Sequence, residues 1–277
     1  MREKLWNIQN CKCFICNELI DLKLHTTNID HNTPLANKGK DSEENFAVTH
    51  ESCNKSKQDA DLKIARILYK LKKIQEDTLQ AENKSASLKQ LLVAYSGSKY
   101  DFKYSIKGDK LSYSFSELGD NKIYEIEVHT DFLSNEKTCF ISFPLEYIYH
   151  DELINPRGIN NSISKLVKEF DKKNPQLHLS LGRVENNKIK IFDGQHKAVA
   201  QILLGNKRIL IRVFIDPDID RLTETNTNAG SVLSQIAFDK SVMQQLNNTL
   251  YYERIKKYQL NCPLSLTTYI FYHRDFR

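Results

Sequence analysis

The sequence lacks several features that would assign it to a common class of protein. No apolar run approaches the roughly 18–20 residues that a membrane-spanning helix needs, so we expect no membrane partner. The N-terminal segment has no apolar core of a signal peptide, which favours a cytoplasmic protein. Neither GxxxxGKS/T nor GxGxxG, the glycine motifs of many nucleotide sites, is present, and no internal repeat or low-complexity tract occurs.

The cysteines are too few and too unevenly placed for a disulfide framework. Six occur in 277 residues, and four of them lie within the first 53. In a reducing compartment this clustering indicates metal ligands rather than cross-links. The net charge of +5, from 40 basic and 35 acidic residues, permits a polyanionic partner without demonstrating one. The length predicts two domains, each able to bury a core of its own.

A helical pattern separates the N-terminal segment from the rest of the chain. Apolar residues recur at intervals of three and four from Leu62 to Ile74, and no proline or glycine follows until Gly97. This pattern predicts a long basic amphipathic helix over residues 61–98, which would connect a module at 1–60 to a domain at 99–277. The simpler interpretation of its basic residues is a solvated face, and contact with DNA phosphates is the alternative.

The remainder of the chain mixes strand and helix patterns. Alternating apolar and polar residues on both sides of Lys107–Lys110 predict a β-hairpin over 100–115. Residues 219–260 are expected to be mostly helical, with an interrupting loop at Asn226–Gly230. The other expected elements are strands at 188–192 and 209–215 and helices at 163–170 and 197–204. The predicted fold class is therefore α+β.

Two ligand pairs in the N-terminal segment predict a structural zinc site. Cys13 and Cys16 form a CxxC, and His50 and Cys53 repeat the same spacing, with 33 residues between the two pairs. Two such pairs can present three thiolates and one imidazole tetrahedrally, which is the donor set of structural zinc. The alternative is that the cysteines are small core residues. Cys11 is a spare thiol that could substitute as a ligand.

Between the two pairs, Asp30 and His31 place a carboxylate beside an imidazole. Such a pair can hold a divalent metal and a base at one point, although alone it is more often a loop histidine with a local partner. The order of elements over residues 13–57 resembles the HNH, or ββα-metal, nuclease family. The matching elements are the CxxC, a DHxxP at Asp30, an NF at Asn45 and an HxxCNxxK that ends at Lys57.

The resemblance implies a small ββα-metal module that is stabilised by a structural zinc ion. His31 would be the general base that deprotonates water for attack on the scissile phosphate. Asp30 and Asn54 would hold one Mg²⁺ or Mn²⁺, and Asn45 would tether the loop that orients His31. Lys57 occupies the position at which the family places a phosphate-facing lysine. The residues expected to contact double-stranded DNA are Lys55, Lys57, Lys63 and Arg66.

A second motif lies in the C-terminal half, where a predicted strand runs into Asp193-Gly194-Gln195-His196-Lys197. A tight glycine turn that opens onto a helix N-terminus leaves backbone N–H groups available for an anion. A strand–turn–helix of this kind is also a frequent packing device. The sequence of this segment is similar to the DGQHR branch of the ParB/sulfiredoxin-like superfamily, and the similarity covers roughly residues 140–245.

This second resemblance implies a ParB-like α/β domain with a pocket for a nucleotide or a DNA backbone. Asp193, Gly194, Gln195, His196 and Lys197 would lie at its rim. The family's arginine is Lys197 here, and lysine keeps the charge but loses bidentate recognition of phosphate.

The two resemblances together favour a cytoplasmic HNH endonuclease whose second domain senses or positions the DNA. A role in antiviral defence, by restriction of modified DNA, follows from the domain pairing alone. One alternative is a DNA-modification sensor or transcriptional regulator with a weak nuclease. Another is a nucleotide hydrolase that uses the site around Asp193. The sequence leaves open whether the protein forms a homodimer and whether the chain is part of a longer protein.

Overall fold

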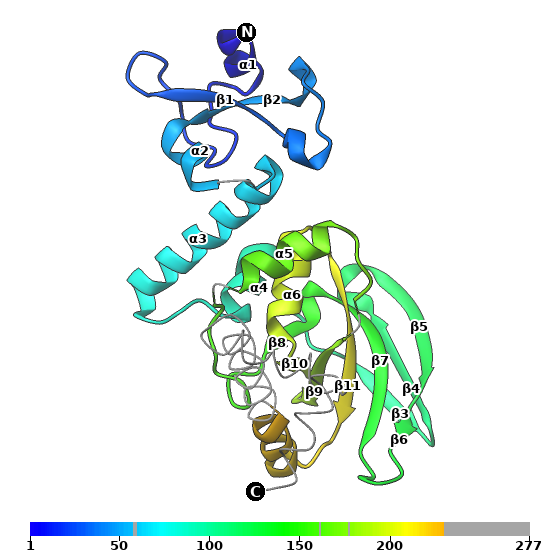
Figure 1. Ribbon diagram of the computed structural model, residues 1–277. Coiled ribbons are helices and arrows are strands. Elements are labelled where there is room, and N and C mark those ends of the chain that lie inside the picture. The colour runs from blue at the N-terminus through cyan, green and yellow to red at the C-terminus, as the bar shows by residue number, and fades with distance from the viewer. Residues whose placement is uncertain (58–59, 161, 177, 230–277) are drawn as a thin grey trace, which may run out of the picture. The chain divides into compact units, whose positions relative to one another are not determined.

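The computed structural model describes residues 1–57, 60–160, 162–176 and 178–229. Helices and strands are mixed throughout, so the expected α+β class is confirmed (Figure 1). The chain divides into two compact units, Met1–Pro217 and Asp218–Arg277. In the described part of the chain, no helix has the length and apolar character needed to cross a membrane.

The N-terminal module is built on two antiparallel strands followed by a helix. Its elements are α1 (Arg2–Ile8), β1 (Thr27–His31), β2 (Phe46–His50) and α2 (Glu51–Lys57). In the β1–β2 ladder, Thr27 pairs with His50 and His31 pairs with Phe46. Leu5, Ile15, Ile20 and Val48 form its core, and the Trp6 indole N–H donates to the Ile20 carbonyl. The module therefore has its own apolar centre.

The single helix expected at 61–98 is two helices, α3 (Leu62–Glu82) and α4 (Leu88–Ser96), so this prediction was wrong. The chain leaves α3 at Asn83, which adopts the left-handed conformation with φ of 53° that asparagine tolerates. Ser87 then begins α4 with a capping box, in which Ser87 and Gln90 satisfy each other's backbone N–H groups. Neither the left-handed residue that ends α3 nor the capping box that begins α4 requires a glycine or a proline.

Helix α3 contributes to two cores. Leu62 and Ala65 are buried with the N-terminal module, while Ile64 and Leu71 are buried with the larger domain that follows. Asp61 begins the helix by accepting a hydrogen bond from the Lys63 N–H. The helix is thus more than a solvated connection, because its apolar positions are shared between two packed regions.

The larger domain contains a six-stranded mixed sheet in the order β6-β7-β11-β9-β10-β8. β11 runs parallel to β9 and β10 runs parallel to β8, while the other neighbours are antiparallel. The strands are β6 (His129–Thr130), β7 (Lys137–Pro144), β8 (Ile148–His150), β9 (Ser180–Glu185), β10 (Lys188–Asp193) and β11 (Arg208–Ile215). The strands expected at 188–192 and 209–215 are therefore confirmed.

A separate three-stranded antiparallel sheet contains the hairpin expected at 100–115. Its strands are β3 (Tyr104–Lys107), β4 (Lys110–Phe115) and β5 (Asp120–Glu127). Lys107 pairs with Lys110, so Gly108 and Asp109 form a two-residue turn in which Gly108 has φ of 60°. Phe102 and Phe115 pack against Phe143 of β7, which joins the small sheet to the large one.

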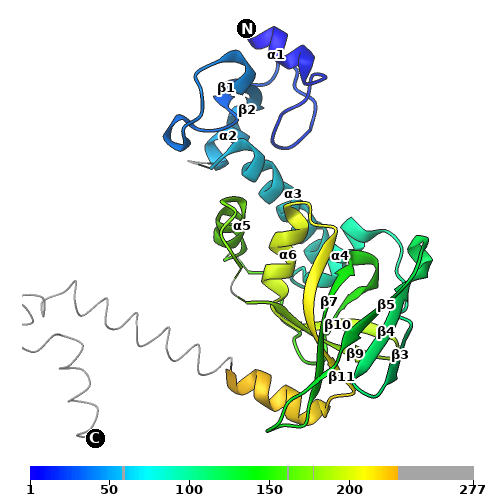
Figure 2. The ribbon, with the colours of Figure 1, turned by 90° about the vertical axis from the view of Figure 1, so that its right-hand side faces the viewer.

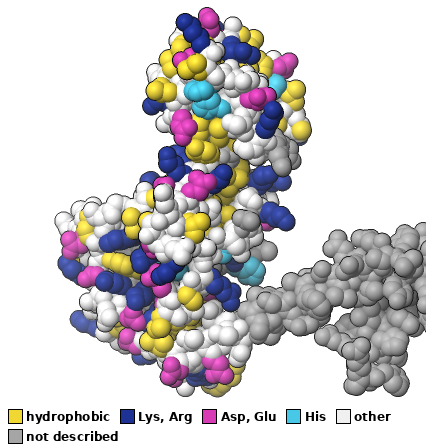
Figure 3. Space-filling model, turned by 90° about the vertical axis from the view of Figure 1, so that its left-hand side faces the viewer, with side chains coloured by type: hydrophobic (Ala, Val, Ile, Leu, Met, Phe, Trp, Pro, Cys, Tyr) yellow, Lys and Arg dark blue, Asp and Glu magenta, His cyan; other side chains and the backbone are white. Residues whose placement is uncertain are grey.

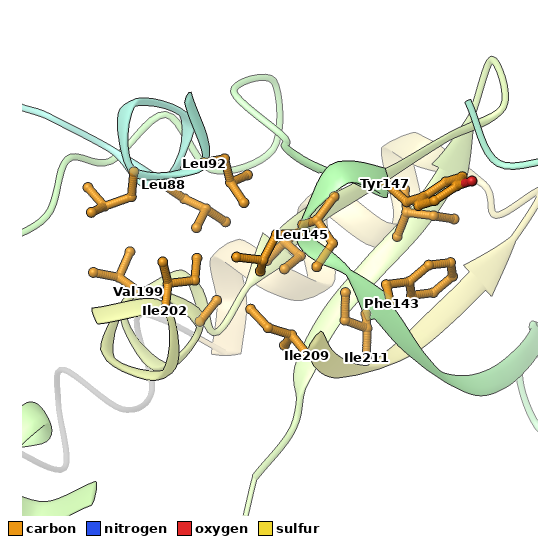
Figure 4. Close-up of a cluster of buried hydrophobic side chains, with 14 of the residues drawn as sticks. Leu88, Leu92, Phe143, Leu145, Tyr147, Val199, Ile202, Ile209 and Ile211 are labelled. Atoms are coloured by element: carbon orange, nitrogen blue, oxygen red, sulfur yellow. The ribbon is translucent and has the colours of Figure 1, made fainter. Parts of the chain in front are cut away.

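Helices α5 (Ile163–Asp171) and α6 (Gln195–Leu203) confirm the helices expected at 163–170 and 197–204. Side chains of α4 face those of α6 next to the strands (Figure 4). These helices and the small sheet lie on different sides of β7 and β11 (Figures 1 and 2). In the second unit, residues 219–229 are helical, so the loop expected from Asn226 was wrong for residues 226–229; Gly230 and residues 231–260 lie outside the described residues.

Candidate functional site

The two sequence pairs in the N-terminal module meet at one point. One ligand atom from each of Cys13, Cys16, His50 and Cys53 lies within 4.8 Å of the others. Cys16 Sγ is 3.4 Å from His50 Nδ1, and the His50 N–H donates to Cys13 Sγ at 3.4 Å. The first pair occupies a tight turn after α1, while His50 ends β2 and Cys53 lies in the first turn of α2. Such a group could hold a metal such as zinc.

The chemistry of this cluster fits a resident cation. Burial raises the pKa of the Cys16 thiol to about 12, and burial also raises the pKa of Cys53. Without a cation the two thiols therefore stay protonated at neutral pH. Three thiolates and an imidazole are the soft and borderline donors that zinc prefers, and a divalent ion supplies the charge that favours the thiolate form.

The predicted catalytic pair lies at the end of β1, in the same module. One Asp30 carboxylate oxygen, Oδ1, accepts the His31 backbone N–H at 2.8 Å, and the other, Oδ2, is 2.9 Å from Lys57 Nζ. His31 Nε2 is 3.1 Å from Asp41 Oδ1, and its ring packs edge-on against Phe46. The His31 side chain is 23% exposed, which leaves the imidazole within reach of solvent.

Asn45 holds the loop that carries Asp41. Its Oδ1 accepts the Thr33 N–H at 2.9 Å, and its Nδ2 donates to the Thr33 and Lys40 carbonyls at 2.9 and 2.8 Å. A Cβ on Gly39 would lie 1.9 Å from the Thr33 carbonyl oxygen, so the loop closes only with glycine at that position. Asn45 therefore connects both ends of the segment from Thr33 to Lys40.

Asn54 offers an oxygen that has no hydrogen-bond partner among the residues that the structure describes. Its Oδ1 is buried and accepts no hydrogen bond, which is costly for a carboxamide unless another group satisfies it. Asn54 lies on α2, which packs against β1 and β2. The Asp30 carboxylate and this carboxamide oxygen are hard donors of the kind that Mg²⁺ and Mn²⁺ prefer, although Asp30 Oδ2 is paired with Lys57 here.

The basic residues expected to contact DNA all have protein partners. The Lys57 side chain is only 6% exposed and pairs with Asp30, so its ammonium does not lie at the surface. Lys55 pairs with Glu51, and Lys63 pairs with Asp171. The Arg66 guanidinium lies 5.5 Å from the centre of the Phe14 ring. On the face drawn in Figure 3, basic and acidic side chains alternate without a large patch of one sign.

In the larger domain, Gly194 makes the expected turn between β10 and α6. It adopts φ of +74° at the N-cap of α6, and a Cβ there would lie 2.9 Å from Ser180 Cα. The Ser180 hydroxyl donates to the Gly194 carbonyl at 3.3 Å. Asp193 before the turn is exposed and Lys197 after it is half-buried. The glycine is therefore required both by the backbone conformation and by the space available.

Gln195 and His196 form hydrogen bonds that connect a preceding loop to the start of α6, whereas they were expected at the rim of a phosphate pocket. Gln195 is buried, and its Nε2 donates to the Arg157 carbonyl at 2.9 Å. His196 Nε2 accepts the Asn160 N–H at 3.1 Å. Burial lowers the pKa of His196, as does the nearby Arg157, which keeps the imidazole neutral and able to accept. Two residues of the predicted site thus have structural contacts.

One feature of the larger domain has no clear signal in the sequence. Arg183 and Asp151 are fully buried, with Arg183 Nε 2.5 Å from Asp151 Oδ2. Arg183 Nη1 also lies 2.7 Å from Glu185 Oε1, which in turn pairs with Lys190. Arg183 and Glu185 are two positions apart in β9, so their side chains lie on the same face of the strand. His25, which packs edge-on against His50, is a second residue that spacing did not single out.

No protein-family model matches the chain, and comparison with curated proteins finds no match.

Proposed function

We propose that the chain is a metal-dependent endonuclease of the HNH type that hydrolyses phosphodiester bonds of double-stranded DNA. The observation that carries the proposal is the strand–strand–helix module, which places Asp30 and His31 at the end of β1 and Asn54 on the adjoining helix. The Asn54 Oδ1, which is buried and accepts no hydrogen bond from the described residues, is the second support, because a bound cation would satisfy it.

Each proposed catalytic residue of the module has a separate role in the reaction. The His31 imidazole takes the proton of the attacking water, while its contact with Asp41 fixes the orientation of the ring. The Asn45 carboxamide holds the loop that brings Asp41 to His31. Asp30 and Asn54 would hold Mg²⁺ or Mn²⁺, which stabilises negative charge on the phosphate and on the leaving oxygen when bound.

The four-ligand cluster has a structural role in this proposal. Its ligands come from the turn after α1, the end of β2 and the start of α2, so a zinc ion there would fasten the elements that carry the catalytic residues. A module of about 60 residues buries only a small core, and a bound metal is a usual source of added stability at this size.

The proposal is tested by cleavage of supercoiled plasmid with Mg²⁺ or Mn²⁺. Wild-type protein should nick or linearise the plasmid, and His31→Ala should not. His178→Ala, which removes an exposed imidazole of the larger domain, should cleave like the wild type. If zinc-loaded wild-type protein cuts neither ordinary plasmid nor plasmid carrying phosphorothioate linkages, the endonuclease proposal is wrong.

The larger domain supplies the second candidate function, in which the segment from Asp193 to Lys197 binds nucleotide or DNA phosphate. The helix N-terminus behind Gly194 supports this function. A difference between ordinary and phosphorothioate plasmids would assign recognition of modified DNA, and with it a restriction role, to this domain. Nucleotide hydrolysis that is lost in Asp193→Ala and retained in His31→Ala would instead assign catalysis to the second site.

A further inference from the structure

Lys57 is in an unusual position for a residue of a DNA-binding module. It is the last residue of α2, and its side chain turns inward until only 6% of it is exposed. Its Nζ lies 2.9 Å from Asp30 Oδ2 and 3.2 Å from the Ala60 carbonyl oxygen. The ammonium is therefore buried at the carboxylate that the proposed function assigns to the divalent metal.

Each Asp30 oxygen has a protein partner in this arrangement. Oδ1 accepts the His31 backbone N–H at 2.8 Å, and Oδ2 holds the Lys57 ammonium. A buried ammonium without a counter-charge is strongly unfavourable, and the Asp30 carboxylate, which is 23% exposed, supplies that counter-charge. Each group therefore compensates the other, and Lys57 supplies the positive charge that Asp30 requires when no metal is bound.

A divalent cation cannot simply be added to this pair. Two cations on one carboxylate oxygen repel each other strongly at such distances in a partly buried site. Repulsion between the two cations therefore favours displacement of the ammonium when Mg²⁺ or Mn²⁺ binds Asp30 Oδ2. Lys57 has a flexible four-carbon stem at the end of a helix, so its charge can leave the pocket without unfolding the module.

We propose that Lys57 is a tethered counter-cation that occupies Asp30 in the metal-free protein and exchanges with the divalent metal. This inference rests on the proposed function, since it takes Asp30 as a metal ligand. In the metal-free state Lys57 keeps the carboxylate in place beside His31 and weakens the binding of metal. In the metal-bound state the ammonium is released toward solvent, where it is available to a phosphate of the substrate.

The exchange can be followed directly by the reactivity of the lysine amine. Zinc-loaded full-length protein is acetylated briefly with an N-hydroxysuccinimide ester, with and without Mg²⁺, and the modified peptides are quantified by mass spectrometry. Lys57 should become several-fold more reactive with Mg²⁺. Lys55 on the same helix is 72% exposed and pairs with Glu51, so its reactivity should not change. Lys57 reactivity that is independent of saturating Mg²⁺ and Mn²⁺ overturns the proposal.

Metal affinity provides a second measurement. Mn²⁺ binding to zinc-loaded protein is measured by electron paramagnetic resonance for wild type, Lys57→Met, Lys57→Arg and the matched control Lys55→Met. Lys57→Met should bind Mn²⁺ at least several-fold more tightly, because it removes the competing charge. Lys57→Arg and Lys55→Met should show no such gain. Unchanged or weaker Mn²⁺ binding in a folded Lys57→Met protein contradicts the exchange.

These measurements separate the inference from the endonuclease proposal. Neither uses DNA, so exchange at Lys57 in a protein that never cuts plasmid would retain the inference and reject the nuclease. A protein whose cleavage depends on His31 but whose Lys57 does not respond to metal would do the opposite. Asp30→Asn should abolish the Mn²⁺ response in both the wild-type and the Lys57→Met background.

Discussion

His31 Nε2 lies 3.1 Å from Asp41 Oδ1, so one nitrogen of the proposed general base is committed to a carboxylate. A carboxylate only accepts hydrogen bonds, which places the proton of a neutral His31 on Nε2 and leaves Nδ1 as the nitrogen that can accept a proton from water. Asp41 thus acts on the base from a loop that Asn45 and Gly39 hold closed.

Removal of the Asp41 carboxylate should slow cleavage without abolishing metal binding. Asp41→Ala frees the His31 ring to rotate and to adopt the other tautomer, and we expect the rate of plasmid cleavage to fall about 10-fold or more. Glu44→Gln is the control, because it removes one negative charge from the same loop at an exposed position. Equal rates for Asp41→Ala and wild type would show that Asp41 does not orient the base.

Gly39→Ala should disrupt the same loop by sterics. Its Cβ would lie 1.9 Å from the Thr33 carbonyl oxygen and 3.0 Å from Asn45 Nδ2, so the segment that Asn45 closes must open. We expect loss of cleavage with retention of zinc, since the four-ligand cluster lies outside this loop. Lys40→Ala, whose backbone carbonyl can still accept from Asn45, should remain active in the same assay. Zinc content and plasmid cleavage measured on one preparation distinguish the two effects.

The cysteine cluster should bind about one zinc ion per chain, measured by inductively coupled plasma mass spectrometry. Cys53→Ser should lose this zinc and leave residues 1–57 open to proteolysis. Cys11→Ser should keep it, because Cys11 is not among the four clustered ligands. Retention of zinc by Cys53→Ser would mean that the metal lies elsewhere or that Cys11 replaces the missing ligand.

Zinc affinity should rise with pH. The pKa of Cys16 is raised to about 12 in the metal-free protein, and the pKa of Cys53 is also raised, so both thiols are protonated at neutral pH. Binding of zinc must then release protons, and lowering the pH opposes it. Titration with a zinc-buffering chelator at several pH values, with the released protons measured by calorimetry in two buffers, checks the sign. Affinity that is independent of pH from weakly acidic to weakly alkaline solution would contradict these pKa shifts.

Asp151→Asn should destabilise the larger domain strongly. It leaves the Arg183 guanidinium buried with one counter-charge fewer, and breaking a buried pair from one side costs roughly 3–5 kcal/mol of unfolding free energy. Asp171→Asn breaks the exposed pair with Lys63 and should have little effect. Urea unfolding of both variants provides the comparison. A small change in Asp151→Asn would show that Glu185 alone compensates Arg183.

Local signals explain which parts of the structure the sequence could predict. Cys13 and Cys16, like His50 and Cys53, are three residues apart, so each pair is positioned by a single turn of backbone. The hairpin followed from Gly108 and Asp109 in the same way, since a two-residue turn fixes the register of its strands. The packing relationship between the two cysteine pairs was also within reach, because each pair is incomplete alone.

Contacts between side chains that are far apart in the sequence could not be predicted from local signals. Arg183 pairs with Asp151, which lies 32 positions earlier, directly after β8, so no local pattern indicates the pair. Lys57 was expected to face a substrate phosphate because of its place in the motif, and its pairing with Asp30 depends on how α2 meets β1. The break between α3 and α4 was missed because Asn83 adopts a conformation that glycine more often signals.

Helix α3 has a consequence for how the chain comes apart. Because neighbouring turns of one helix are buried in two cores, neither core can melt without exposing apolar side chains that belong to the other. Loss of the zinc ion should therefore destabilise residues far from its ligands. We expect faster amide hydrogen exchange along α3 from Leu62 toward Leu71, and a lower melting temperature of the larger domain. A metal bound by four side chains near the N-terminus would in this way set the cooperativity of the whole first unit.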